Sequence, residues 1–239
     1  MEPKISLGWP KNKYEAVNIQ KELAGRVDLV SNNKEPSTIA AIDTAYGFGG
    51  EKLYAAVVVV SFPGLREIER TYYVDAVNFP YYPGLFFFRE GPVIIEALKK
   101  LKSQPDLLIV HGHGIAHPRY IGLACHLGLC FEIPTVGCAR KLLAGTHRPV
   151  GENKGSCQPI LLHGKEVGYA YRSKARVKPI FISPGYKCDL FLARDIVVKC
   201  LRDYRLPEPL RLAHLFANKF KRFNEKDLKK TDSELSLET

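Results

Sequence analysis

Three consecutive strand-like segments in the first third of the chain constrain its fold more than any other feature. Residues 38–46, 53–62 and 67–74 read as strands, and a glycine-rich turn and the pair Pro63-Gly64 separate them. Turn residues between strand-like runs favour consecutive hairpins. We therefore expect a fold organised around one sheet whose first part is antiparallel.

The rest of the chain alternates helical and strand-like segments. Apolar residues at helical spacing predict a helix over residues 11–30 and a second helix that begins near Glu90, with Pro92 in its first turn. Further predicted elements are strands at 106–110, 135–137, 159–162, 167–172 and 179–182 and helices at 120–131, 190–203 and 209–222. This order predicts an α/β fold with a mixed β-sheet flanked by helices. It also suits a ribonuclease H-like fold, although the pattern alone does not single that fold out.

The length and composition are those of an ordinary globular protein. The chain has 239 residues, of which 46% are hydrophobic and 25% charged, so it can bury a large core without disulfides or structural metals. We expect one domain over residues 1–222. The polar tail over residues 223–239 has little to bury, and we predict that it is disordered.

Several protein classes are not expected from this sequence. The six cysteines form no CxxC pair, which argues against a zinc site and fits a reducing, cytoplasmic compartment. The longest apolar run, Ala55–Phe62, is far too short to span a membrane. The N-terminus lacks the apolar region of a signal peptide. We expect a monomer that has no membrane contact and no small-molecule cofactor.

The charge balance points toward a polyanionic partner. The chain carries 35 Lys and Arg against 25 Asp and Glu, a formal net charge of +10. Nucleic acid is the leading candidate because its phosphates attract such a surface over long range. A soluble protein from a basic proteome is the ordinary alternative.

The segment His111–Arg119, with the sequence HGHGIAHPR, is the most informative stretch for chemistry. It follows a predicted buried strand and precedes a predicted helix, the position at which α/β proteins bind ligands. Gly112 and Gly114 allow a close approach of the backbone to a ligand. For His113, a local hydrogen bond and a ligand contact are equally good interpretations. For His117, at a helix start, we favour a phosphate or ligand contact.

Two carboxylates lie in otherwise apolar surroundings. Asp43 interrupts a buried strand, and a buried carboxylate needs a metal or a cation as a partner. The alternative is an Asp that turns the chain into the hairpin. Glu90 follows three phenylalanines at the predicted helix start, where an acid stabilises the helix whatever the function. It gains functional interest only if the fold brings it beside Asp43.

The loop Tyr81-Tyr82-Pro83-Gly84 is aromatic and stiffened by proline. Aromatic side chains on a basic protein can unstack or hold a nucleic-acid base. Tyrosines that cap the edge of a core are equally common.

Together these segments resemble the successive motifs of the endonuclease V family. The matching strings are FPYYPGLFFFREGP, PDLLIVHGHGIAHPRYIGLACHLGL, EIPTVGCARKLL, PIFISPG and PEPLRLAHLFA, in that family's order, over roughly residues 38–217. The resemblance implies a ribonuclease H-like, Mg²⁺-dependent nuclease that recognises inosine in DNA or RNA. Such an enzyme cuts one linkage beyond the 3′ side of the lesion and leaves 3′-hydroxyl and 5′-phosphate ends.

The resemblance also implies roles for individual residues. Asp43 and Glu90 match metal-site carboxylates, and Tyr81 matches the wedge that fills the gap left by a displaced base. The positions that match further active-site residues are His117, Arg140 and His214. The positions that match the backbone lining the base pocket and holding phosphates are Pro83, Gly84, Gly112, His113, Gly114, Ser183 and Gly185.

Three positions depart from the family's pattern. His111 stands where the family has a metal-site Asp, Arg140 stands where it usually has Lys, and Tyr186 stands where His is frequent. With His111 among the metal ligands, Mg²⁺ should bind more weakly, because it prefers oxygen, and Mn²⁺ becomes the alternative ion. Arg140 keeps the charge that a phosphate clamp needs. Besides an active nuclease, the sequence leaves open an inosine-binding protein that no longer cuts and a related nuclease for branched or flapped strands.

Overall fold

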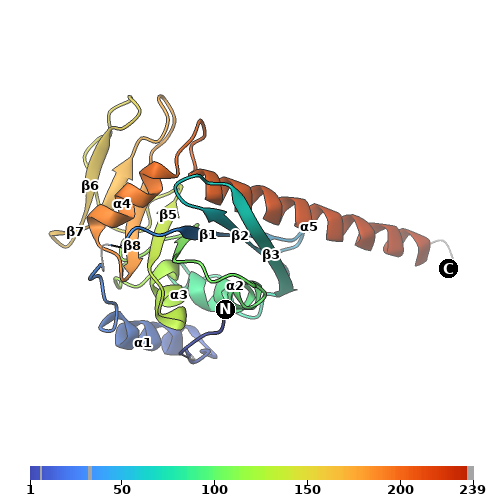
Figure 1. Ribbon diagram of the computed structural model, residues 1–239. Coiled ribbons are helices and arrows are strands. Elements are labelled where there is room, and N and C mark those ends of the chain that lie inside the picture. The colour runs from blue at the N-terminus through green and yellow to red at the C-terminus, as the bar shows by residue number, and fades with distance from the viewer. Residues whose placement is uncertain (6, 32–33, 236–239) are drawn as a thin grey trace.

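The computed structural model describes residues 1–5, 7–31 and 34–235 and has one mixed sheet as its centre (Figure 1). The order of the eight strands is β3-β2-β1-β4-β5-β8-β7-β6. The strands are β1 (Thr38–Tyr46), β2 (Lys52–Ser61), β3 (Glu67–Ala76), β4 (Leu107–Val110), β5 (Thr135–Ala139), β6 (Cys157–Leu162), β7 (Lys165–Tyr171) and β8 (Ile180–Tyr186). The helices are α1 (Lys13–Ala24), α2 (Phe86–Lys99), α3 (Leu123–Phe131), α4 (Leu190–Lys199) and α5 (Glu208–Leu235). The predicted α/β class and mixed sheet are confirmed.

Helices cover both faces of the sheet, and the alternation of side chains along β1 shows how. Ala40 and Ile42 belong to a core that includes α2 and α3, whereas Ile39 and Ala41 belong to a second core that includes α4 and α5. Successive side chains of a strand point to opposite faces, so a strand covered on both sides is apolar throughout. Asp43 comes two residues after Ala41 and therefore points to the same face, the one covered by α4 and α5.

The pairing of β1 and β4 fixes the position of the loop that begins at His111. The two strands are parallel, with Ile42 opposite Val110. The backbone N–H of His111 donates to the Ile42 carbonyl over 2.9 Å. Asp43, within β1, thus lies beside His111, the first residue after β4, at the carboxyl end of a parallel strand, where such sheets place ligand sites.

The predicted start of α2 is wrong. The helix begins at Phe86 instead of near Glu90, and Pro92 lies inside it. Phe87 and Phe88 are buried, and the Phe87 ring stacks on His126 with 4.2 Å between the ring centroids. Burial of these rings outweighs the one backbone hydrogen bond that Pro92 removes. As a result Glu90 is a buried residue within the helix and not an acid at its start.

Both terminal helices differ from their predicted lengths. α1 ends at Ala24, before the predicted limit at residue 30, whereas α5 continues beyond Arg222. The carboxylate of Glu225 in this extension is buried and accepts the backbone N–H of Phe48 over 2.8 Å. This contact ties the helix to the β1–β2 turn. The division of the chain at residue 222 and the disorder of the tail stay predictions, and residues 236–239 lie outside the described residues.

Among the described residues, no helix combines the length and the apolar character that a membrane crossing needs.

Candidate nucleic-acid active site

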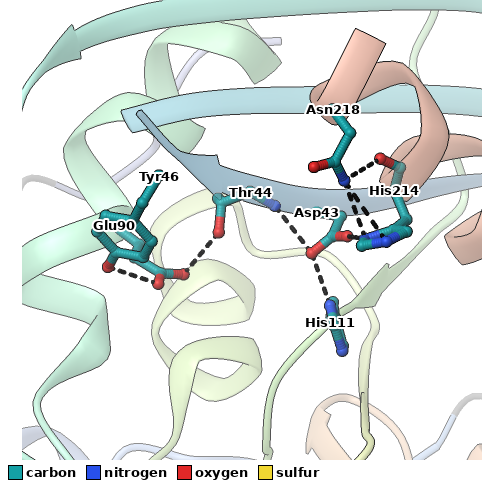
Figure 2. Close-up of polar contacts among 7 residues, drawn as sticks. All are labelled: Asp43, Thr44, Tyr46, Glu90, His111, His214 and Asn218. Carbon is teal, nitrogen blue, oxygen red and sulfur yellow. Dashed lines mark hydrogen bonds and ion pairs between the residues drawn. The ribbon is translucent and has the colours of Figure 1, made fainter. Parts of the chain in front are cut away.

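Asp43 lies at the centre of a hydrogen-bonded group with two histidines (Figure 2). The Nδ1 atom of His111 lies 2.6 Å from one carboxylate oxygen, and Nδ1 of His214 lies 2.7 Å from the other. The backbone N–H of Thr44 donates to the first oxygen over 2.9 Å. We refer to Asp43, His111 and His214 as the His–Asp–His group.

Three different elements bring this group together. Asp43 belongs to β1, His111 follows β4, and His214 comes from α5, which packs across β1 and β2. One turn later on α5, the side-chain amide of Asn218 donates to the His214 carbonyl over 2.8 Å. The sequence places Asp43 and His111 side by side, but it does not reveal that His214 closes the other side of the carboxylate.

The histidines keep Asp43 ionised in spite of its burial. Burial by itself would raise the pKa of Asp43, but the hydrogen bonds from His111 and His214 lower it to about 2. The side chain is only 4% exposed, so at neutral pH a buried negative charge is held between two imidazoles. Since an ionised carboxylate accepts from both Nδ1–H groups, each ring keeps its Nε2 atom on the side away from Asp43.

Glu90 approaches the same region from α2 on the other face of β1. The hydroxyl of Tyr46 donates to one Glu90 oxygen over 2.9 Å, and the hydroxyl of Thr44 donates to the other over 3.2 Å. Burial raises the pKa of Glu90, the two hydroxyls oppose this change, and the Asp43 charge adds to it. Thr44 thus stands between the two carboxylates (Figure 2). Sequence reasoning gave no role to Thr44 and Tyr46. Side chains alternate along β1, and this alternation could have predicted that both face α2 and Glu90.

The arrangement does not fit a resident Mg²⁺ ion. Both oxygens of Asp43 are engaged by imidazoles, and both oxygens of Glu90 are engaged by hydroxyls. Across the described residues, no three His, Cys, Asp or Glu side chains are grouped so that they could hold a metal ion. Mg²⁺ needs near-octahedral oxygen ligands, and here His111 occupies a position close to Asp43 with nitrogen instead.

A second cluster holds the loop that contains Tyr81. The carbonyl of Gly84 accepts three donors: His117 Nε2 at 2.8 Å, Arg119 Nη2 at 3.0 Å and Gln20 Nε2 at 3.0 Å. Arg119 Nε also donates to the Gln20 side-chain oxygen over 2.6 Å. We refer to Gln20, His117 and Arg119 as the Gly84 anchor. Sequence reasoning missed Gln20, a buried polar residue on an otherwise amphipathic helix, and gave no role to Arg119.

His117 in this anchor is neutral and fully engaged. Its Nδ1 atom accepts the backbone N–H of Arg119 over 3.2 Å, while Nε2 donates to Gly84. Burial lowers the pKa of His117 to about 4. Neither ring nitrogen is left for a phosphate, so the structure does not support the phosphate contact that the sequence favours for His117.

A small cavity separates the Gly84 anchor from the loop after β4. Its lining includes Gly84, Phe87, Gly112, His113 and Leu123, and its volume is about 20 Å³. This is room for about one water molecule, so a base has to displace part of the lining to enter.

His113 is turned away from the Asp43 carboxylate, because its Nε2 atom donates to the Lys141 carbonyl over 2.9 Å. Burial lowers the pKa of His113 to about 4.

Gly114, Ser183 and Gly185 are not among the described residues that line this cavity. The backbone N–H of Gly114 donates to the Ser183 hydroxyl over 2.8 Å, and Ser183 is buried. A Cβ atom at Gly114 would collide with the Pro184 carbonyl, so only glycine lets the loop pack on β8. Ser183 and Pro184 of β8 thus hold the part of the loop that contains Gly114.

Two further residues singled out from the sequence are exposed. Tyr81 is 59% exposed at the outer side of its loop, with its ring 5.5 Å from that of Phe86 between centroids. Arg140 follows β5 and is exposed, and its carbonyl accepts from Arg205 over 2.7 Å. Within the described part of the chain, no hydrogen bond or ion pair joins Arg140 to the His–Asp–His group.

The chain matches the Endonuclease V family over residues 21–215. It is 42% identical over 223 residues to the endonuclease V of Gloeobacter violaceus, an alignment that covers 91% of each chain. The chain belongs to the endonuclease V family. Proteins of this family are nucleases, which are hydrolases that cut phosphodiester bonds within a strand, and they are typically metal-dependent.

Solved structures agree with the family membership. The crystal structure of endonuclease V from Streptomyces avermitilis is similar with a TM-score of 0.85 and 35% identity, and the match covers 94% of this chain and 100% of that one. An endonuclease V of Ciona intestinalis, in complex with a 24mer DNA that contains an inosine followed by a ribo-adenosine, is similar with a TM-score of 0.76 and 25% identity. That match covers 90% of this chain and 98% of the Ciona chain. The ribonuclease H-like fold expected from the sequence is thereby confirmed.

Proposed function

We propose that this endonuclease V family member cleaves DNA or RNA strands that contain inosine. The observation that supports this most is that His111 and His214 contact the buried Asp43 beside the end of β4, while the buried Glu90 lies on the other face of β1 with only Thr44 in between. Acidic and imidazole groups at one point serve proton transfer and phosphate chemistry. The inosine-containing DNA in the Ciona complex supports inosine as the feature recognised.

Different residues of the chain orient the imidazoles, receive the base and fill the gap in the strand. Asp43 orients both imidazoles, so that each presents Nε2 toward the scissile phosphate for proton transfer or hydrogen bonding. The inosine base enters beside Gly84 and Gly112, and Tyr81 fills the gap that the base leaves in the strand. The cut falls one linkage beyond the 3′ side of inosine and leaves 3′-hydroxyl and 5′-phosphate ends.

The required ion is Mn²⁺ in preference to Mg²⁺ in this proposal. A divalent ion supplies charge neutralisation at the phosphate when it is bound. The residues that would hold it are Asp43, Glu90 and His111, a mixed oxygen and nitrogen set, and both carboxylates would have to exchange their present hydrogen bonds for the ion. Mn²⁺ accepts imidazole more readily than Mg²⁺ does.

A second candidate is an inosine-binding protein with weakened cleavage. The specific observation in its favour is the hydrogen bond of 2.6 Å between His111 and Asp43, because it engages a carboxylate oxygen that an ion would need. In this case the Gly84 loop and Tyr81 still recognise the base, while the phosphate is not cut.

The two candidates are separated by measuring strand cleavage with the wild type and His111→Asp. Matched strands with inosine or adenine are incubated with Mn²⁺, with Mg²⁺ or with chelator, and the product ends are mapped. We expect inosine-dependent cleavage by the wild type in Mn²⁺ and a gain of about tenfold or more in Mg²⁺ for His111→Asp. The exposed His163 gives the control, since His163→Asp adds the same charge far from Asp43.

Equal wild-type rates in Mg²⁺ and Mn²⁺ contradict the choice of ion. Equal cleavage of inosine and adenine strands contradicts inosine as the recognised feature. Inosine-selective binding without cleavage by either protein, with either ion, favours the second candidate.

A further inference from the structure

One face of α5 runs from the His–Asp–His group to the β1–β2 turn at residues 47–51. His214, Asn218, Lys221 and Glu225 follow one another at intervals of four, three and four residues, which is the spacing of one helix face. His214 at one end contacts Asp43 over 2.7 Å. Glu225 at the other end accepts the backbone N–H of Phe48 over 2.8 Å. A single row of side chains therefore connects the site with this turn.

The turn presents an aromatic ring beside a positive charge. The Phe48 side chain is 71% exposed, and the Lys221 ammonium lies 5.6 Å from the centroid of its ring. A Cβ atom at Gly47 would collide with the Glu225 carboxylate, so glycine is needed for the turn to approach α5 this closely. The backbone of Gly47 and Phe48 is thus held against α5.

The combination suits an unpaired nucleic-acid strand. A base stacks on an aromatic ring, and a neighbouring cation neutralises the adjacent phosphate. Seven residues of helix separate His214 from Lys221, which is about 10 Å along the axis. Since stacked nucleotides in one strand repeat every 3.4 Å or so, about three nucleotides span this interval.

The opposite flank of α5 provides a contrast. There Phe216 and Phe220 pack against Tyr72 of β3, with ring centroids 5.9 and 3.6 Å from that of Tyr72. Lys219 and Phe223 lie on this flank and line a cavity of about 340 Å³. This hollow is larger, but the helix itself separates it from Asp43. Lys219 and Phe223 therefore offer the same two residue types without the continuous row to the site.

We propose that Phe48 and Lys221 form an additional subsite that binds the unpaired substrate strand about three nucleotides from the site. The subsite rests on the proposed function for the identity of the strand. Phe48 stacks with one base, and Lys221 binds a phosphate beside it. Phe48 and Lys221 belong neither to the His–Asp–His group nor to the Gly84 anchor, so the subsite affects affinity and leaves the chemistry at the scissile linkage unchanged.

The test uses the full chain with Phe48→Ala, Lys221→Gln and the matched controls Phe223→Ala and Lys219→Gln. Binding is measured on long inosine strands and on strands cut back to two nucleotides on either side of the inosine. We expect Phe48→Ala to weaken binding of the long strand about fivefold or more. We expect Lys221→Gln to reduce the slope of log affinity against log salt by about 0.7. The controls should match the wild type.

Strand length and a fluorescent base give readouts that a structural defect would not reproduce. Removing nucleotides on one side of the inosine should abolish the effect of Phe48→Ala, and 2-aminopurine on that side should be quenched by the wild type but not by the variant. Equal effects of Phe48→Ala and Phe223→Ala, or an effect independent of strand length, would overturn the subsite. The ratio of affinities for inosine and adenine strands tests the proposed function separately, because the subsite does not contact the position at which the two strands differ.

Discussion

His111 and His113 are two residues apart in one loop, yet their surroundings give them opposite properties. His111 faces the ionised carboxylate of Asp43, with 2.6 Å between its Nδ1 atom and the carboxylate Oδ1 atom. His113 is held by a backbone carbonyl, and burial lowers its pKa to about 4. His214 and His117 differ in the same way, since one contacts Asp43 and the other contacts Gly84. Two of the imidazoles thus contact a charged carboxylate, whereas burial beside a carbonyl partner makes the other two neutral structural groups.

This contrast assigns separate tasks to the two clusters. The His–Asp–His group should govern cleavage, and the Gly84 anchor should govern the shape of the loop that receives the base. Variants in the first cluster should lower rates without weakening binding, and variants in the second should do the reverse. A variant that affects both properties equally would break the distinction.

The largest effect is expected for Asp43→Asn, which removes the charge and keeps the size of the side chain. Without an ionised carboxylate the two imidazoles lose their common acceptor, so the single-turnover rate on an inosine strand should fall by about 10²- to 10⁴-fold. Binding of that strand should stay within about twofold. The exposed Asp75 supplies the control Asp75→Asn. Retention of the full rate by Asp43→Asn would show that the His–Asp–His group takes no part in cleavage.

The dependence of stability on pH should reveal the histidines that are held neutral. Burial lowers the pKa of His126 to about 3 and that of His117 to about 4, against about 6.5 in an unfolded chain. Between these values the unfolded chain binds the additional protons, so the free energy of unfolding falls as the pH drops below about 6.5. The expected slope is roughly 1.4 kcal/mol per pH unit for each such histidine.

A variant at His126 isolates one of these protons. His126→Phe keeps an aromatic ring against Phe87 and should flatten the slope between pH 6.5 and 4 by about one proton. The measurement is urea-induced unfolding at several pH values, with His163→Phe at an exposed position as the control. An unchanged slope for His126→Phe would mean that His126 is protonated in the folded chain.

The elements of the fold were largely predictable, because they depend on local patterns. Each of the eight predicted strands overlaps a strand of the sheet, since apolar runs bounded by turn residues mark strands whatever their neighbours. Asp43 stood out for a similar reason, as a charge within a buried run. The start of α2 was misplaced because Pro92 is a good first-turn residue, and only the burial of Phe87 and Phe88 reveals that the helix begins earlier.

The contacts within the site were less predictable, because they join residues far apart in the chain. Gln20 and Arg119 are 99 residues apart, and nothing local to either one indicates that both hold the Gly84 carbonyl. His117 was given a phosphate contact because of its place at a helix start, yet the fold turns both its nitrogens to backbone groups. Sequence patterns identify which residues are unusual, and only the three-dimensional arrangement shows which partner each one has.

The Gly84 anchor leads to the third prediction. His117→Ala leaves Gly84 with two of its three donors and creates a small void, so the free energy of unfolding should fall by about 2 kcal/mol. Binding of inosine strands should weaken in parallel, because the loop that carries Tyr81 loses part of its support. The rate of cleavage at saturating strand should stay close to that of the wild type. Denaturant titration and single-turnover kinetics on His117→Ala and the exposed control His163→Ala test this division of tasks.

The smallest effect is expected at Tyr81, which lies outside both clusters but depends on the Gly84 anchor for its position. Tyr81→Ala should weaken binding of inosine strands about fivefold to tenfold, the usual loss when one stacking contact is removed. Because the side chain is 59% exposed, the free energy of unfolding should hardly change. Tyr14, at 82% exposure, gives the matched control Tyr14→Ala. If Tyr81→Ala binds like Tyr14→Ala, the loop positions something other than a wedge. If Tyr81→Ala instead lowers the cleavage rate of bound strand, the two clusters are coupled through this loop.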